Sequence, residues 1–118
     1  MSKILIVEKD KNFSSNICEI LELYEYKTEQ CYETQNIEEQ IRKSDPNLLI
    51  LSISIDYDQS GIEIMQRLLP DHNLPVVIIS DNYLKELFNG QLKEIKNSII
   101  INKPFTAKEL LAAVKSLI

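Results

Sequence analysis

The sequence is poor in the residues that interrupt regular structure, with two Gly and four Pro among its 118 residues. This scarcity excludes collagen-like, linker-like and low-complexity chains. It also leaves too few glycines for a glycine-rich phosphate-binding loop, which needs two or three of them in one turn. The chain has one His and two Cys. Without carboxylates these three residues do not complete the four ligands of a zinc site, and no ligand spacing suggests such a site.

Long apolar runs and an excess of positive charge are also missing. The first apolar run, residues 4–7, is far too short for a signal peptide or a membrane span, so we expect a cytoplasmic protein. In the cytoplasm Cys18 and Cys31 should be reduced thiols that pack as small apolar side chains. The net charge of −5 leaves no electrostatic footprint for non-specific nucleic-acid binding. We therefore expect neither nucleic acid nor membrane as a partner of this domain.

The composition that remains is that of an ordinary soluble globular domain. Apolar residues make up 44% of the chain and charged residues 26%. These values, and a length near the common domain size, predict a single domain over residues 1–118 with its own hydrophobic core.

Five segments have the character of β-strands. Four of them are almost continuously apolar, which is typical of parallel strands that are covered on both faces. They are Lys3–Val7, Leu48–Ser52, Val76–Ser80 and Ile99–Ile101. The fifth, Thr28–Tyr32, is mixed and polar, as expected at the edge of a sheet.

Helical patterns lie between the strands. Apolar residues spaced by three and four predict one buried face on the first helix, formed by Phe13, Ile17, Ile20, Leu21 and Tyr24. Comparable patterns follow over residues 62–69 and 83–88.

Two further helices begin with the spacing of a capping box, in which a side chain and a Glu three residues later satisfy free backbone N–H groups. Asn36 with Glu39 opens one of them, and Thr106 with Glu109 opens the last. The expected buried residues are Ile37 and Ile41 in the first of these, and Leu110, Leu111, Val114 and Leu117 in the second.

The order of strand and helix repeats five times, which predicts a doubly wound, flavodoxin-like α/β fold. Its five-stranded parallel sheet would be joined by right-handed crossovers and covered by five helices on its two faces. In such sheets ligands collect at the carboxyl ends of the strands. The candidate site residues at these ends are Glu8, Lys9, Asp10, Ser52, Ser80, Lys103 and Pro104.

The order and spacing of these four clusters resemble the receiver domain of bacterial response regulators along the whole chain. That family has an acidic pair after the first strand and a phospho-accepting Asp at the end of the third. Ser or Thr ends its fourth strand, and Lys-Pro follows the fifth. Glu8, Ser80, Lys103 and Pro104 match this pattern. The resemblance implies the strand order 2-1-3-4-5, a cis bond before Pro104, and two-component phosphorelay signalling with a histidine kinase or an output protein as partner.

The resemblance also implies Mg²⁺ chemistry, for which this sequence lacks key residues. Ser52 stands at the acceptor position, Lys9 at the second acidic position, and Ile100 where the family commonly has an aromatic residue. The four aligned positions hold Glu8, Lys9, Ser52 and Lys103. Their formal charge is −2 in a working pocket and +1 here. Such a swing should weaken Mg²⁺ binding by about 10³-fold or more. We therefore hypothesise a degenerate receiver, not an enzyme, with weak or absent Mg²⁺ binding and Ser52 as a neutral filler.

Several alternatives remain open at this stage. Asp10, Asp56 or Asp58 could rebuild the acidic cluster and keep phosphotransfer; Asp10 alternatively caps the first helix, and Glu8 and Asp10 are the remaining candidate metal ligands. Lys9 either reaches toward Glu8 in place of the metal or is solvated, and Lys103 could pair with Glu8.

Two further interpretations concern partners and class. If two or more of four apolar residues are exposed together, they would form a partner or homodimer patch on the face made by the fourth helix, fifth strand and fifth helix. They are Tyr83, Leu87, Phe88 and Ile100. A small flavodoxin-like nucleotide- or cofactor-binding protein is the rival class, but the turn over residues 8–14 has no glycine to cradle a phosphate.

Overall fold

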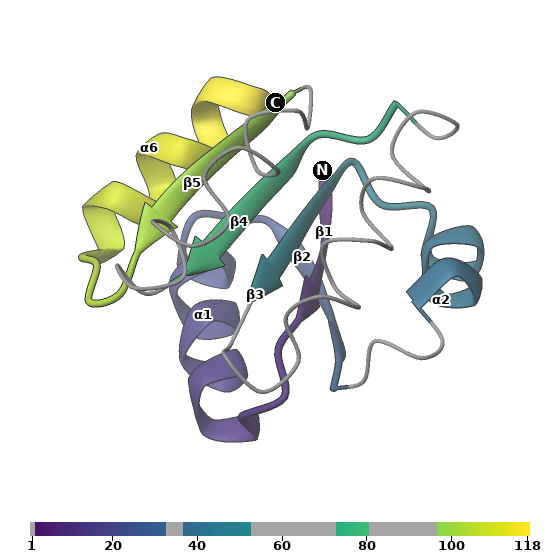
Figure 1. Cartoon of the computed structure of the whole chain (residues 1–118), viewed down its shortest axis with the longest axis horizontal. Coiled ribbons are helices and arrows are strands. Elements are labelled where there is room, and N and C mark those ends of the chain that lie inside the picture. Colours follow the sequence, from purple (N-terminus) through teal and green to yellow (C-terminus); the bar gives the residue numbers. More distant parts are fainter. Residues whose placement is uncertain (1, 33–36, 53–72, 81–96) are drawn as a thin grey trace.

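The computed structural model describes residues 2–32, 37–52, 73–80 and 97–118. Five parallel strands form one sheet in the order β2-β1-β3-β4-β5, which confirms the predicted topology (Figure 1). The strands are β1 (Lys3–Val7), β2 (Lys27–Cys31), β3 (Leu48–Ser52), β4 (Val76–Ser80) and β5 (Ser98–Asn102). Three strands have the predicted bounds, whereas β2 begins and ends one residue earlier and β5 gains one residue at each end.

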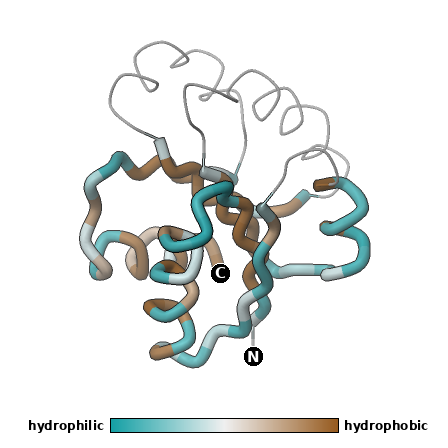
Figure 2. Tube along the Cα trace, turned by 90° about the horizontal axis from the view of Figure 1, so that it is seen from below, coloured by the Kyte–Doolittle hydropathy of each residue, from teal (hydrophilic) through white to brown (hydrophobic). Residues whose placement is uncertain are grey.

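Three of the predicted helices fall within the described residues: α1 (Lys11–Leu23), α2 (Ile37–Ser44) and α6 (Ala107–Leu117). The patterns at 62–69 and 83–88 lie outside the described residues. Helices α1 and α6 lie on one face of the sheet and α2 lies on the other (Figures 1 and 2). Among the described residues, no helix is both long enough and apolar enough to span a membrane.

The sheet has a hydrophobic layer on each face, which explains why the central strands are apolar at successive positions and polar only at their ends. In β1, Ile4 and Ile6 belong to the layer under α1 and α6, whereas Leu5 and Val7 belong to the layer under α2. All four side chains are buried. Successive side chains of a strand point to opposite faces, so a strand covered on both sides buries apolar residues at neighbouring positions.

The two cysteines lie on opposite faces of this sheet. Cys18 on α1 packs in the layer shared with α6, and Cys31 at the end of β2 packs in the layer under α2. Both are buried thiols that form no disulfide with each other. The prediction that both cysteines pack as small apolar side chains is therefore confirmed.

Helix α1 begins and ends through specific local contacts. The Asp10 carboxylate accepts hydrogen bonds from the backbone N–H groups of Asn12 (3.0 Å) and Phe13 (3.2 Å), which makes Asp10 the N-cap. The prediction that Tyr24 lies on the buried face is wrong, because the helix ends at Leu23 and Tyr24 is 54% exposed at the C-cap. The next residue, Glu25, has a φ of 68° and turns the chain back toward β2.

The other two helices follow the predicted patterns with small differences. Thr106 and Glu109 form the complete capping box of α6, and Leu117 is only partly buried. In α2, Ile37 and Ile41 are buried, as predicted. The predicted cap Asn36 lies outside the described residues. Glu39 forms an ion pair with Lys43 (3.0 Å).

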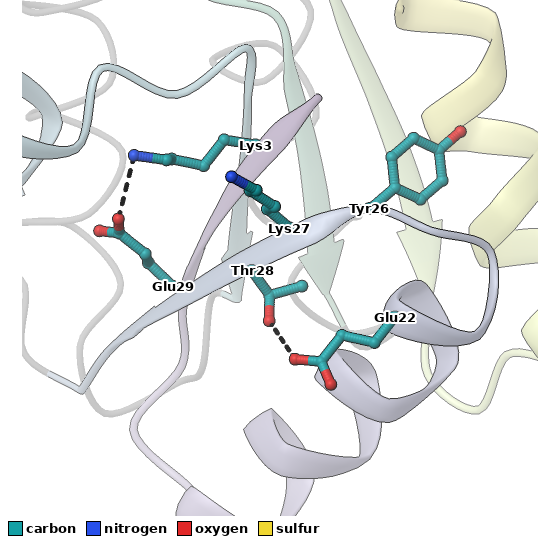
Figure 3. Close-up of a pocket in the computed structure, with 6 residues that line it drawn as sticks. All are labelled: Lys3, Glu22, Tyr26, Lys27, Thr28 and Glu29. Atoms are coloured by element: carbon teal, nitrogen blue, oxygen red, sulfur yellow. Dashed lines mark hydrogen bonds and ion pairs between the residues drawn. The ribbon is translucent and has the colours of Figure 1, made fainter. Parts of the chain in front are cut away.

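The amino-terminal edge of the sheet is held together by polar contacts (Figure 3). Lys3 Nζ donates to the carbonyl of Ser44 (2.9 Å) and lies 3.2 Å from Glu29 Oε1. The Thr28 hydroxyl donates a hydrogen bond to Glu22 Oε1 (2.7 Å). Lys3, Glu22, Thr28 and Glu29 all line one pocket of about 490 Å³. These side chains satisfy one another, so they connect β1, β2, α1 and α2 at the edge opposite the candidate site.

Candidate functional site

The fold brings the predicted site residues to one edge of the sheet. Glu8 directly follows β1, Ser52 ends the neighbouring strand β3, Ser80 ends β4, and Lys103 directly follows β5. Because these strands are parallel and in register, their carboxyl ends meet at the same edge. The sequence clusters are therefore one site in three dimensions.

Glu8 is a buried charge of this site, with 7% of its surface exposed. Its Oε1 accepts a hydrogen bond from Ser52 Oγ (3.1 Å) and lies 3.5 Å from Lys103 Nζ. A buried carboxylate is costly unless it is paired and hydrogen-bonded. The Ser52 hydroxyl and the Lys103 ammonium supply that compensation, so the predicted pairing of Lys103 with Glu8 is confirmed.

Lys103 is held from a second side by an aromatic ring. Its Nζ lies 4.2 Å from the ring centroid of Phe13, which in turn packs edge-to-face on Phe105 at 5.8 Å. The Lys103–Pro104 peptide bond is cis, as the resemblance implied. Phe13 was predicted only as a core residue; its place just after the acidic cluster is the signal that could have marked it as part of the site.

Ser80 lies on the other side of the site. Its side chain is fully buried, and its hydroxyl donates to Oδ1 of Asn102 (3.3 Å). The backbone N–H of Lys103 donates to the Ser80 carbonyl (2.8 Å). These bonds connect the end of β4 to the segment that carries Lys103.

The described part of the site does not suit a divalent cation. Mg²⁺ prefers several oxygen ligands, with carboxylates foremost. The carboxylate of Glu8 already faces an ammonium, and that of Asp10 caps α1. Within residues 2–32, 37–52, 73–80 and 97–118, no group of three His, Cys, Asp or Glu side chains could hold a metal. The alternative ligands Asp56 and Asp58 lie outside the described residues.

The remaining predicted residues are more peripheral. Lys9 is exposed. Ile100 is partly buried and packs against the hydrophobic layer under α2. The other members of the predicted partner patch, Tyr83, Leu87 and Phe88, lie outside the described residues.

The five-stranded order, the polar strand ends and the cis Lys-Pro step define a protein of the receiver type. Residues 4–115 match the response regulator receiver domain family, and the chain belongs to this family. That match covers nearly the whole sequence and includes every site residue discussed above.

The chain is also similar to longer regulatory proteins. It is 23% identical over 115 residues to the regulatory protein VirG of Agrobacterium tumefaciens (strain 15955), covering 98% of this chain and 43% of that protein. It is 22% identical to VirG of Rhizobium rhizogenes, covering 98% of this chain and 47% of that protein. The chain therefore spans less than half the length of these relatives.

Solved structures show the same fold. The receiver domain of NtrX from Brucella abortus superimposes with a TM-score of 0.83 at 22% identity, covering 97% of this chain and 96% of that one. A two-component response regulator from Clostridium difficile gives 0.84 at 20% identity, covering 99% and 95%. The chemotaxis protein CheY4 of Vibrio cholerae gives 0.85 at 16% identity, covering 100% and 99%.

Proposed function

We propose that this receiver domain does not accept a phosphoryl group in the usual way and acts through protein contacts. The observation that carries the proposal is the hydrogen bond from Ser52 Oγ to Glu8 Oε1 at the end of β3. At the position where the family has its phospho-accepting Asp, this chain has a neutral hydroxyl. That hydroxyl is used to compensate a buried carboxylate.

The chemistry of the two side chains supports this proposal. An Asp carboxylate is an anion at neutral pH and can attack a phosphoryl donor directly. A Ser hydroxyl needs a base to become a competent nucleophile. The carboxylate beside Ser52 already faces the Lys103 ammonium at 3.5 Å, so it serves as one partner of an ion pair. We therefore assign Ser52 a structural role and propose that the domain is not an enzyme.

Electrostatics supports the proposal as well. Glu8 and Lys103 cancel each other, and the exposed Lys9 adds a positive charge near the same strand end. Mg²⁺ binding should then be weak, because a divalent cation gains little from a neutral or positive site. Phosphotransfer that relies on Mg²⁺ to neutralise phosphoryl oxygens would lose that support.

The proposed partners are proteins of a two-component pathway in the cytoplasm, either a histidine kinase or an output protein. Membership of the receiver family favours this interpretation over a flavodoxin-like cofactor-binding protein. A single compensated pocket would present one conformation to such a partner. A homodimer through the face that carries Ile100 remains the alternative arrangement.

The decisive experiment is incubation with acetyl phosphate and excess Mg²⁺, followed by intact-protein mass measurement. We expect no stoichiometric phosphoryl adduct on the wild-type protein, because the acceptor position carries a hydroxyl. Ser52→Ala is the matched control and should behave in the same way. An acid-stable, alkali-labile adduct on both proteins would overturn the proposal, and mapping it to Asp10, Asp56 or Asp58 would establish the rival phosphotransfer.

A further inference from the structure

A groove runs between helix α1 and the segment that leads into α6, on the face of the sheet opposite α2 (Figures 1 and 2). It has a volume of about 510 Å³. Its apolar lining consists of Phe13, Ile17, Ile20, Pro104 and Phe105. We propose that this groove is the centre of a two-fold interface between two copies of the chain. The proposal goes beyond the proposed function, because it concerns the α1–α6 face and holds whether or not the domain accepts a phosphoryl group.

The apolar surface extends from the groove to the carboxyl end of α1. Leu23 and Tyr24 follow Ile20 by three and four residues, which places them beside it on the helix. Leu23 is 80% exposed and Tyr24 is 54% exposed. A single exposed apolar side chain is normal, whereas a contiguous apolar surface is typical of an interaction site.

Helices α1 and α6 lie side by side along this face and run in the same direction. Near their beginnings, the ring of Phe13 on α1 packs edge-to-face on Phe105, with the ring centroids 5.8 Å apart. Near their ends, Lys115 Nζ on α6 lies 5.8 Å from the ring centroid of Tyr24. A second molecule that covers the groove would therefore contact both helices.

An exposed stripe on each helix flanks the apolar surface, and each stripe consists of residues spaced by three and four. On α1 the stripe is Asn16, Glu19 and Leu23, and on α6 it is Lys108, Ala112 and Lys115. The charge on the α1 stripe is therefore negative, whereas that on the α6 stripe is positive.

This division of charge identifies a second copy of the chain as the occupant. A two-fold axis parallel to the helices places α1 of each copy over α6 of the other, so that an acidic stripe meets a basic stripe twice. The apolar surface is then covered by the same surface of the partner. A partner of uniform charge would leave one stripe facing a like charge. The dimer should be weak, because each copy carries a net charge of −5.

The test is sedimentation velocity over a concentration series that reaches about 1 mM. We expect a monomer–dimer equilibrium for the wild type. Leu23→Ser should weaken the dimer by about tenfold or more, because two apolar side chains lose their burial. The variant should fold normally, since Leu23 is largely exposed in the monomer.

A charge exchange tests the proposed pairing of the stripes. Glu19→Lys and Lys115→Glu should each weaken the dimer by about tenfold or more, because like charges then meet at both contacts. An equimolar mixture of these two variants should recover dimerisation, since opposite charges face each other again. Arg42→Glu changes the charge by the same amount as Lys115→Glu, but on α2 at the other face, and should behave like the wild type.

Three results would overturn the proposal. A wild type that stays monomeric over the whole series would show that the α1–α6 face is left to a different protein. A dimer that Leu23→Ser does not weaken would place the interface on another surface, such as the face that carries Ile100. A mixture that stays as weak as the separate charge variants would exclude the proposed pairing. The acetyl phosphate experiment is independent of all three, so the two proposals can fail separately.

Discussion

Glu8 is a single residue whose neighbours decide what the cleft can do. Surrounded by other carboxylates, it would form part of an acidic cluster that attracts a divalent cation. Here its Oε1 accepts a hydrogen bond from Ser52 and faces the ammonium of Lys103. The same side chain at the same strand end is thereby satisfied within the protein. Under the proposed function, the hydroxyl of Ser52 in place of a carboxylate changes the chemistry that the cleft supports.

At the residue scale, Cys18 also predicts how the stability of the protein depends on pH. Burial raises the pKa of its thiol, because an apolar surrounding disfavours the thiolate. The unfolded chain therefore loses this proton at a lower pH than the folded protein does. The resulting stability is fully present below the unfolded pKa of about 8.5 and is lost as pH rises through the higher folded pKa.

We expect the free energy of unfolding of the wild type to fall relative to that of Cys18→Ala as pH increases from about 8 to about 10. Urea titrations of both proteins at several pH values measure this difference, and the other titrating groups cancel in the comparison. A difference that stays constant over this range would contradict the prediction.

At the scale of elements, the ends of the helices are specified by short-range chemistry. Asp10 caps α1, and Thr106 with Glu109 caps α6. Both caps stand between a site residue and the helix that follows it, so they also set where Glu8 and Lys103 lie. The carboxyl end of α1 was not predictable in this way: apolar spacing placed Tyr24 on the buried face of the helix, whereas Tyr24 is the exposed C-cap.

The capping box of α6 yields a prediction on stability. Thr106 Oγ1 accepts a hydrogen bond from the Glu109 N–H (3.1 Å), and the Thr106 N–H donates to Glu109 Oε1 (3.4 Å). We expect Thr106→Ala to lower the free energy of unfolding by about 1 kcal/mol, because an N–H group of the first turn loses its acceptor. Thr106→Ser keeps the hydroxyl and should stay near the wild type in chemical denaturation. Equal losses in both variants would argue against the capping explanation.

At the scale of the whole molecule, the carboxyl ends and the amino ends of the strands differ in the contacts they make. The carboxyl edge carries the site, whereas the amino-terminal edge ties the layers together through Lys3. The Lys3 ammonium donates to the last carbonyl of α2, that of Ser44. It also forms an ion pair with the side chain of Glu29 on β2 (Figure 3). A cation at the end of a helix also interacts favourably with the helix dipole. One side chain thus links β1 to an edge strand and to a helix on one face.

This connection predicts the effect of Lys3→Met. The variant should lose about 0.5–1.5 kcal/mol of unfolding free energy, a modest value because the Lys3 and Glu29 side chains are both partly solvated. Urea unfolding at low and high salt measures the loss, which should shrink as salt screens the ion pair. Lys108→Met is the exposed control and should change stability little. A loss that is independent of salt would mean that packing, rather than charge, is responsible.

Much of the fold was predictable because the pattern is strong. The apolar runs of β1, β3 and β4 coincide with the observed strands, and the strand order follows the resemblance that Glu8 and Lys103-Pro104 carry. The N-cap role of Asp10 and the pairing of Lys103 with Glu8 were also anticipated. The bounds of β2 and β5 were not, since β2 is mostly polar and β5 begins and ends on polar residues, Ser98 and Asn102, that an apolar run does not include.

The sequence by itself determined the fold class, because short apolar runs that alternate with helical patterns are typical of a parallel sheet covered on both faces. It also determined that the acceptor position holds Ser52, since that follows from residue identity alone. Only the tertiary structure decided that Ser52 Oγ and Lys103 Nζ both contact Glu8 Oε1. It also decided that the ring of Phe13 lies against Lys103. Those contacts join residues far apart in the chain, and their distances depend on strand register and helix packing, which no local pattern encodes.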